Sequence, residues 1–117
     1  MNVRREPRRM PTKSKYALVM VTAPSLKIAR RLAQLALNAR LAACVNLVRG
    51  VESHYWWADK INSSREILMV LKTIRGKVTP LEKLMLAEHP YDTPEFLVLD
   101  IPRGNARYLS WISSSTR

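Results

Sequence analysis

The sequence predicts a single α+β domain whose elements follow the order β-α-β-β-α-β. Two observations lead to this prediction: apolar residues recur at helical spacing in two segments, and short β-rich runs lie before, between and after those segments. A length of 117 residues corresponds to one domain with one hydrophobic core. The order is that of the ferredoxin-like split βαβ fold, in which one sheet carries both helices on a single face.

The first strand and the first helix are expected near the start of the domain. Residues 15–21 (KYALVMV) form a β-rich run that ends at Thr22-Ala23-Pro24. Ser25 is expected to cap a helix with polar and basic residues on its outer side. The apolar stripe of this helix contains Ile28, Leu32, Leu35, Ala36 and Ala39.

A long hairpin is expected after the helix. Residues 43–48 (ACVNLV) and 51–57 (VESHYWW) are interpreted as one strand with a kink at Arg49-Gly50. Residues 58–64 supply the turn, and residues 65–74 (REILMVLKTI) form the returning strand. Trp56 and Trp57 are neighbours, so they place large apolar rings on both faces of the hairpin.

The second half of the chain supplies another helix, a last strand and a short C-terminal helix. Residues 77–89 (KVTPLEKLMLAEH) have Pro80 near the first helical turn, and residues 89–95 form a connector with two prolines. Residues 95–101 (EFLVLDI) are apolar enough to form a central strand or one covered on both sides. Asn105 is expected to cap a final helix over residues 106–112 (ARYLSWI).

The sheet face opposite the helices is predicted to be covered by copies of the same chain. In the strand 65–74, Leu68 and Val70 lie on one face while Ile67, Met69 and Leu71 lie on the other. With the two tryptophans added, the uncovered face would expose an apolar patch too large for a monomer. No spare segment is available to cover it, so a closed symmetric assembly is expected.

The net charge of +11 is concentrated toward the N-terminus, where residues 1–15 hold six basic residues and one acidic residue. Residues 1–14 contain two prolines and few apolar residues, so we expect a disordered basic tail before a domain at 15–117. This tail is either a solvated extension or an arm that contacts nucleic acid. No apolar run approaches the ~20 residues of a membrane span, and the lone Cys44 fits a reducing compartment, so a cytoplasmic protein is expected.

Two other classes of function fit the residues less well. RNA-binding modules share the element order and stack bases on aromatic residues of the first and third strands. Here the third strand has no aromatic residue and the RNP1 pattern is absent. A Gly-rich phosphate loop, an HExxH motif and a Ser/His/Asp set are also absent, so no enzymatic activity is expected.

Four motifs resemble the CutA divalent-cation tolerance family, and the resemblance runs from about Tyr16 to Ile112. It implies a ferredoxin-like subunit in a compact homotrimer, with the long hairpins interlocked between neighbours. It also implies a protein linked to tolerance of copper and other divalent metals, with no assigned reaction and no particular protein partner. The motifs are LAACVNLVRGVESHYWWADKI (41–61), EILMVLKT (66–73), HPYDTPEFLVL (89–99) and GNARYLSWI (104–112).

The resemblance also implies candidate metal ligands. In bacterial relatives, copper is associated with a cysteine before the TAP turn and with paired histidines before PY. This chain has Val21 at the first position and Glu88-His89 at the second, so His89 is the remaining candidate, together with Cys44. Thiolate and imidazole are suitable donors for copper. The alternative is that His89 is a structural hydrogen-bonding residue and Cys44 a small buried one.

A ligand cleft is the second kind of site that the sequence indicates. Glu66 and Lys72 are six residues apart on one strand and therefore share a face, while Tyr91 and Glu95 flank the turn before the last strand. In the family such residues lie near clefts between subunits, similar to those of PII-like trimers. Together with Trp57 they predict a site for a small anion. The alternative is a salt bridge between subunits, from Lys72 to Glu66 or Glu95.

Overall fold

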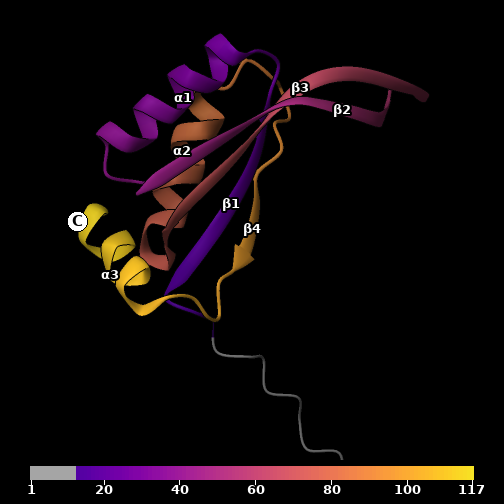
Figure 1. Cartoon of the computed structure of the whole chain (residues 1–117). Helices are drawn as coiled ribbons and strands as arrows, with labels where there is room; N and C mark the ends of the chain where they lie inside the picture. Colours follow the sequence, from indigo (N-terminus) through magenta and orange to yellow (C-terminus); the bar gives the residue numbers. More distant parts are fainter. Residues whose placement is uncertain (1–12) are drawn as a thin grey trace, which may run out of the picture.

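One antiparallel sheet of four strands, in the order β2-β3-β1-β4, forms the centre of the molecule (Figure 1). The computed structural model describes residues 13–117, so residues 1–12 of the predicted basic tail lie outside the described residues. Ser14, the last residue assigned to that tail, is hydrogen bonded to Asp100 and Ile101. The elements are β1 (Tyr16–Ala23), α1 (Leu26–Asn38), β2 (Cys44–Trp57), β3 (Lys60–Ile74), the 3-10 turn η1 (Arg75–Lys77), α2 (Val78–Glu88), β4 (Leu97–Asp100) and α3 (Ala106–Ser115).

The core lies between the sheet and helices α1 and α2. Strand β1 alternates strictly, with Ala17, Val19, Val21 and Ala23 fully buried. The predicted helix cap is confirmed, because the Ser25 side chain accepts a hydrogen bond from the backbone of α1. These features confirm the ferredoxin-like fold that the sequence predicts. The buried helix residues are Ala29, Leu32, Ala33 and Ala36 of α1, and Leu81 and Met85 of α2.

The turn of the long hairpin is much shorter than the sequence predicts. Strand β2 ends at Trp57 and β3 begins at Lys60, so only Ala58 and Asp59 connect them. Both residues have positive φ, +51° and +61°, as a two-residue type I′ turn requires. The prediction of a turn over residues 58–64 was wrong because the polar residues 60–64 continue the strand.

A β-bulge at Arg49-Gly50 changes which tryptophan shares a face with Glu66. Val48 lies opposite Leu68 and Val51 lies opposite Glu66, so three residues of β2 span two of β3. Gly50 has a φ of +72°, a conformation that favours glycine. The extra residue reverses the alternation beyond it, which places Trp57 instead of Trp56 on the face of Glu66.

Strand β4 is an edge strand, and the prediction of a central or doubly covered strand was wrong. It pairs with β1 alone, and all four of its residues are exposed. Leu97 and Leu99 lie opposite Met20 and Leu18, on the sheet face that α1 and α2 leave uncovered. We call this the open face. Its apolar side chains on β4 are therefore exposed to solvent in a single chain.

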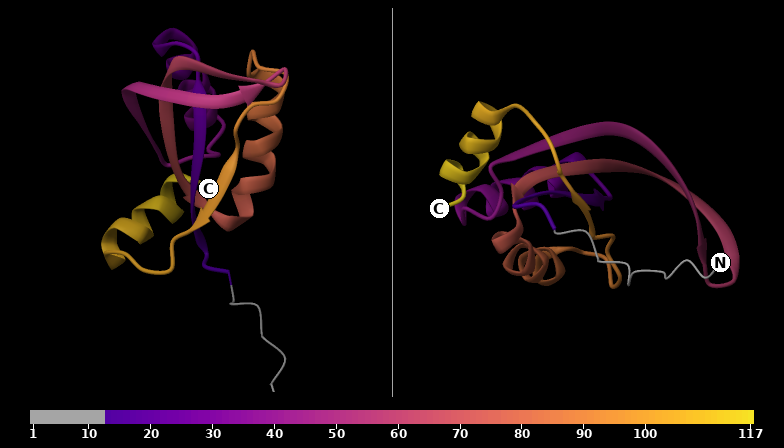
Figure 2. Two further views of the ribbon diagram at one scale, coloured as in Figure 1. Left: turned by 90° about the vertical axis from the view of Figure 1, so that its right-hand side faces the viewer. Right: turned by 90° about the horizontal axis from the view of Figure 1, so that it is seen from below.

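Helix α3 covers one end of the open face, which corrects the expectation that no segment of the chain remains for it. The Tyr16 hydroxyl is 3.0 Å from the Ser113 hydroxyl, and the Lys72 ammonium donates to the Tyr108 hydroxyl. Tyr16 and Lys72 both lie on the open face, and α3 lies across the sheet from α2 (Figure 2). Asn105 caps this helix as predicted, and Ile112 is its buried anchor.

Candidate functional site

A hollow of about 980 Å³ lies between the β2–β3 hairpin and the segment that connects α2 to β4. Its volume is at the upper end of the range for small-molecule sites. Four of the five residues predicted to form a ligand cleft line it: Trp57, Glu66, Tyr91 and Glu95. We refer to it as the hairpin hollow.

Glu66 and Tyr91 form the polar centre of the hairpin hollow. The Tyr91 hydroxyl donates a hydrogen bond of 2.8 Å to Oε2 of Glu66, whose residue is only 8% exposed. Burial, and then this bond to a carboxylate, raise the pKa of Tyr91 to about 12. Burial and the neighbouring Glu66 charge likewise raise the pKa of Glu95. Two carboxylates thus lie close together in a place of limited solvent access.

His89 holds the connector that carries Tyr91 against the sheet. Its Nε2 is 2.7 Å from the carbonyl oxygen of Thr22, and its Nδ1 is 3.0 Å from the backbone nitrogen of Tyr91. A carbonyl can only accept and an amide N–H can only donate, so these bonds require a neutral imidazole with its proton on Nε2. The His89 and Tyr91 rings are also in contact, with centroids 4.7 Å apart. Both nitrogens are therefore already used within the chain.

Cys44 and His89 do not belong to one metal site within a chain. Cys44 lies opposite Lys72 on β3, whereas Thr22, the partner of His89, lies opposite Leu68. Four residues along a strand correspond to about 13 Å. The Cys44 thiol is partly exposed and is 3.9 Å from Oδ1 of Asn46. Within residues 13–117, no three Asp, Glu, His or Cys residues are grouped so that they could hold a metal ion.

Lys72 is separated from the other predicted cleft residues within one chain. Its ammonium lies 3.2 Å from the Tyr108 hydroxyl and 5.5 Å from the centre of that ring. Glu66 is six residues away on β3, on the same face as Lys72 but about 20 Å along the strand. Only a second chain could bring Lys72 to the hairpin hollow.

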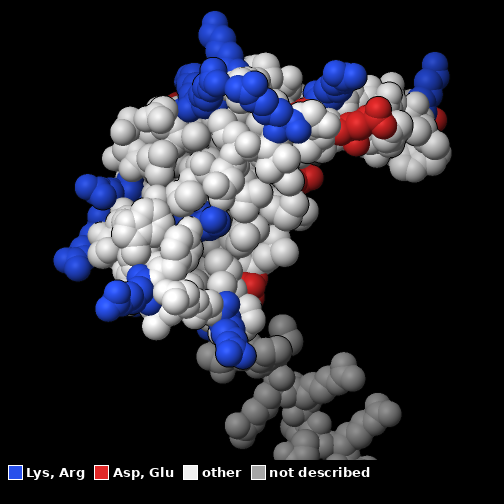
Figure 3. Space-filling model, viewed as in Figure 1, with Lys and Arg blue, Asp and Glu red and all other residues white. Residues whose placement is uncertain are grey.

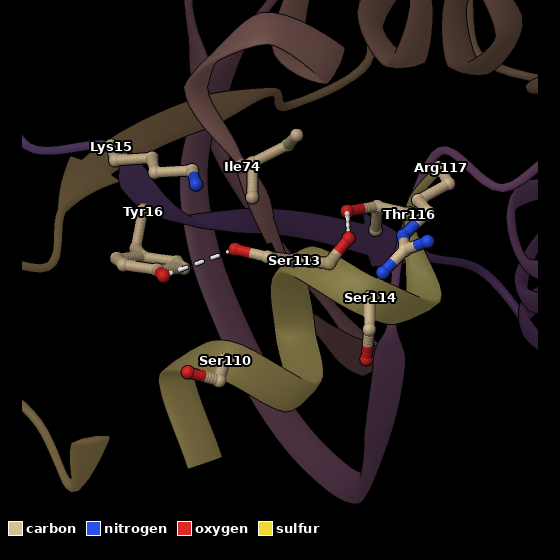
Figure 4. Close-up of a pocket in the computed structure, with 8 residues that line it drawn as sticks. All are labelled: Lys15, Tyr16, Ile74, Ser110, Ser113, Ser114, Thr116 and Arg117. Atoms are coloured by element: carbon tan, nitrogen blue, oxygen red, sulfur yellow. Dashed lines mark hydrogen bonds between the residues drawn. The ribbon is translucent and has the colours of Figure 1, made fainter. Parts of the chain in front are cut away.

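A second hollow, of about 450 Å³, lies at the C-terminal end of α3 (Figure 4). Hydroxyl groups of α3 line it, and Tyr16 and Ser113 face each other across part of it. Lys15 and Arg117 lie at its margin, where positive charge is favourable beside helix carbonyl groups. None of the residues that the sequence singled out for ligand binding lines this hollow.

Sequence reasoning did not assign Tyr55, Trp56 and Asp92 to the cleft, although all three line the hairpin hollow. The cluster of aromatic residues at 55–57 was a visible signal of a special surface. Residues on both faces of β2 reach the same hollow. A strict alternation of faces along a flat strand could not predict this.

The fold and this hollow define a ferredoxin-like subunit with a long projecting hairpin and an aromatic, acidic hollow at its side. Residues 17–115 match the family described as "CutA1 divalent ion tolerance protein". The chain belongs to this family.

Relatives from plants and bacteria show the same similarity. "Protein CutA 1, chloroplastic" of Oryza sativa is 42% identical over 100 residues, which are 86% of this chain and 56% of that protein. "Divalent-cation tolerance protein CutA" of Thermus thermophilus is 38% identical over 99 residues, 85% of this chain and 96% of that protein. The chain thus spans little more than half the length of its plant relatives, but nearly all of the bacterial one.

Solved structures agree with the fold. The crystal structure of CutA1 from Oryza sativa has a TM-score of 0.86 and 40% identity, and covers 91% of this chain and 97% of its own. The "Periplasmic divalent cation tolerance protein CutA" of Archaeoglobus fulgidus has a TM-score of 0.85 and 35% identity, over 87% of this chain and 99% of its own. Among the described residues, no helix has both the length and the apolar character needed to cross a membrane.

Proposed function

We propose that this chain forms a symmetric homotrimer that acts without catalysis in the cell's tolerance of divalent cations. The observation that supports assembly is the exposed apolar surface. Leu97 is 54% exposed, Trp57 62% and Trp56 72%, and the first two lie on the open face or its continuation along the hairpin. A patch of this kind on a monomer indicates an interaction surface.

The hairpin provides a second argument for assembly. Beyond Ile67, β3 has no partner except β2, so residues 60–66 present a strand edge without a neighbour. The hairpin extends away from the body of the subunit (Figures 1 and 2). An isolated two-stranded ribbon is only marginally stable in water. Packing against other copies of the chain would stabilise it, as the interlocked hairpins expected from the sequence would do.

Light scattering coupled to gel filtration tests the assembly, with one variant on the open face and a matched control. Leu97→Lys places a charge on β4, whereas Leu86→Lys does so at the outer side of α2, where the leucine is similarly exposed at 50%. We expect a trimer for the wild type and for Leu86→Lys, and dissociation for Leu97→Lys. A monomeric wild type at micromolar concentration would contradict the proposal.

The proposed metal role rests on the names of the relatives and on one available soft donor. The Cys44 thiol lies on the open face and is partly exposed, so copper could reach it. His89 remains a predicted ligand, but a metal would first have to displace the hydrogen bond to Thr22 or the one from Tyr91. Copper titration of Cys44→Ser, His89→Ala and the wild type separates the two residues. Equal isotherms for all three proteins would remove both from consideration.

A small-anion site of the PII-like kind is a second candidate function. It requires Lys72 of the partner subunit, because this residue of the same chain is bound to Tyr108. The cytoplasmic location likewise stays a prediction, since relatives are named for the chloroplast and the periplasm. Fractionation of cells that express the tagged full-length protein would test it.

A further inference from the structure

The hairpin hollow has an acidic charge in a chain that is otherwise strongly basic. Glu66, Asp92 and Glu95 line it, and among residues 13–117 no lysine or arginine does. Elsewhere basic side chains cover the surface, as on the face shown in Figure 3, where the few acidic ones lie toward the hairpin and the adjoining edge. Because the whole chain carries a net charge of +11, this local reversal is informative. It favours a positively charged ligand over an anion.

The Glu66 carboxylate has capacity for a further hydrogen bond. Tyr91 donates to Oε2, and within residues 13–117 no other donor is bonded to this carboxylate. No polar side-chain atom in the described part of the chain is both fully buried and unpaired, so the second oxygen keeps some access to the hollow. An ionised carboxylate in a largely buried position is costly unless it is paired with donors or positive charge. A cation with N–H groups would supply both.

Aromatic rings surround these carboxylates. Tyr55, Trp56, Trp57 and Tyr91 all line the hollow, from two strands' turn region and from the connector. Aromatic faces attract cations and also cover apolar ligand surface. A hollow lined by both carboxylates and aromatic rings therefore suits a ligand that has a positive end and an apolar body.

We propose that the hairpin hollow binds a small organic cation, a primary ammonium or guanidinium group attached to an apolar body. Glu66 and Glu95 accept its N–H groups, and the tryptophan and tyrosine rings contact its apolar part. A bare divalent metal ion fits less well, because residues 13–117 bring no three ligating side chains together. The proposal does not depend on the trimer, since all of these residues belong to one chain.

Calorimetry on the full-length protein with three matched probes tests the sign of the charge. The probes are benzylammonium, benzyl alcohol and phenylacetate, which share an aromatic body and differ in charge. We expect measurable binding of benzylammonium in the millimolar range or tighter, at least tenfold weaker binding of the alcohol, and none of phenylacetate. Preference for phenylacetate, or equal binding of all three, would overturn the proposal.

Variants test the location of the cation. Glu66→Gln keeps the shape of the side chain and an acceptor for Tyr91, and Glu95→Gln removes the second charge. Each is expected to weaken benzylammonium binding at least fivefold, while Glu82→Gln, on the exposed side of α2, leaves it unchanged. Circular dichroism and gel filtration verify that each variant folds and assembles like the wild type. Unchanged binding in both hollow variants, or no binding to the folded wild type because a neighbouring chain fills the hollow, would overturn the proposal.

Discussion

The substitution His89→Ala tests whether this histidine is a structural residue or a metal ligand. The imidazole is largely buried, and it joins the backbone of Thr22 on β1 to the backbone of Tyr91 in the connector. Removing it leaves a carbonyl oxygen and an amide N–H without their partners. It also removes the ring that packs against Tyr91.

The expected loss of stability follows from these contacts. A buried polar group that loses its partner costs about 1–3 kcal/mol, and two groups are affected here. Pro90 beside the histidine is exposed, so water can reach part of the gap and reduce the cost. We therefore expect the free energy of unfolding to fall by about 2–4 kcal/mol.

Denaturation by urea at one fixed protein concentration measures this loss, because the stability of an oligomer depends on concentration. His54→Ala is the matched control: this histidine is bonded to Glu52 with both side chains mainly exposed, and its loss should cost less than about 0.5 kcal/mol. Copper affinity, measured on the same samples, should be the same for His89→Ala and the wild type. A variant of full stability that no longer binds copper would refute this reasoning.

Three further predictions concern the hairpin and the hollow. Ala58→Gly should raise the free energy of unfolding by about 0.5–1 kcal/mol in urea denaturation, because alanine is strained at a φ of +51°; a loss of stability would contradict the type I′ turn. Gly50→Ala should lower it by about 1 kcal/mol, because φ is +72° there; a neutral result would argue against the bulge. Glu95→Gln should be more stable than the wild type at about pH 8 and lose this advantage near pH 4 in thermal melts. Its pKa is raised in the folded protein, so the stability of the wild type falls as pH rises through that pKa; a constant difference would contradict this cause.

The sequence alone determined the order and type of the elements. Helix α1 follows from a cap at Ser25 and an apolar stripe of period 3.6, and the buried face of β1 from simple alternation. Both are local patterns, and their meaning does not depend on which element lies beside them. The four cleft residues other than Lys72 could also be predicted, because they flank recognisable strand ends.

The tertiary structure decided what depends on neighbours and on register. The exposure of β4 follows from its place at the sheet edge, which its apolar sequence cannot reveal because the same residues would suit a central strand. The bulge at Gly50 inserted one residue and so moved Trp57 to the face of Glu66, although both tryptophans look equivalent in the sequence. Lys72 and Glu66 share a face, but their separation along β3 places them in different surroundings. Alternation specifies a face, whereas contact also requires the position along the strand and the identity of the packed neighbour.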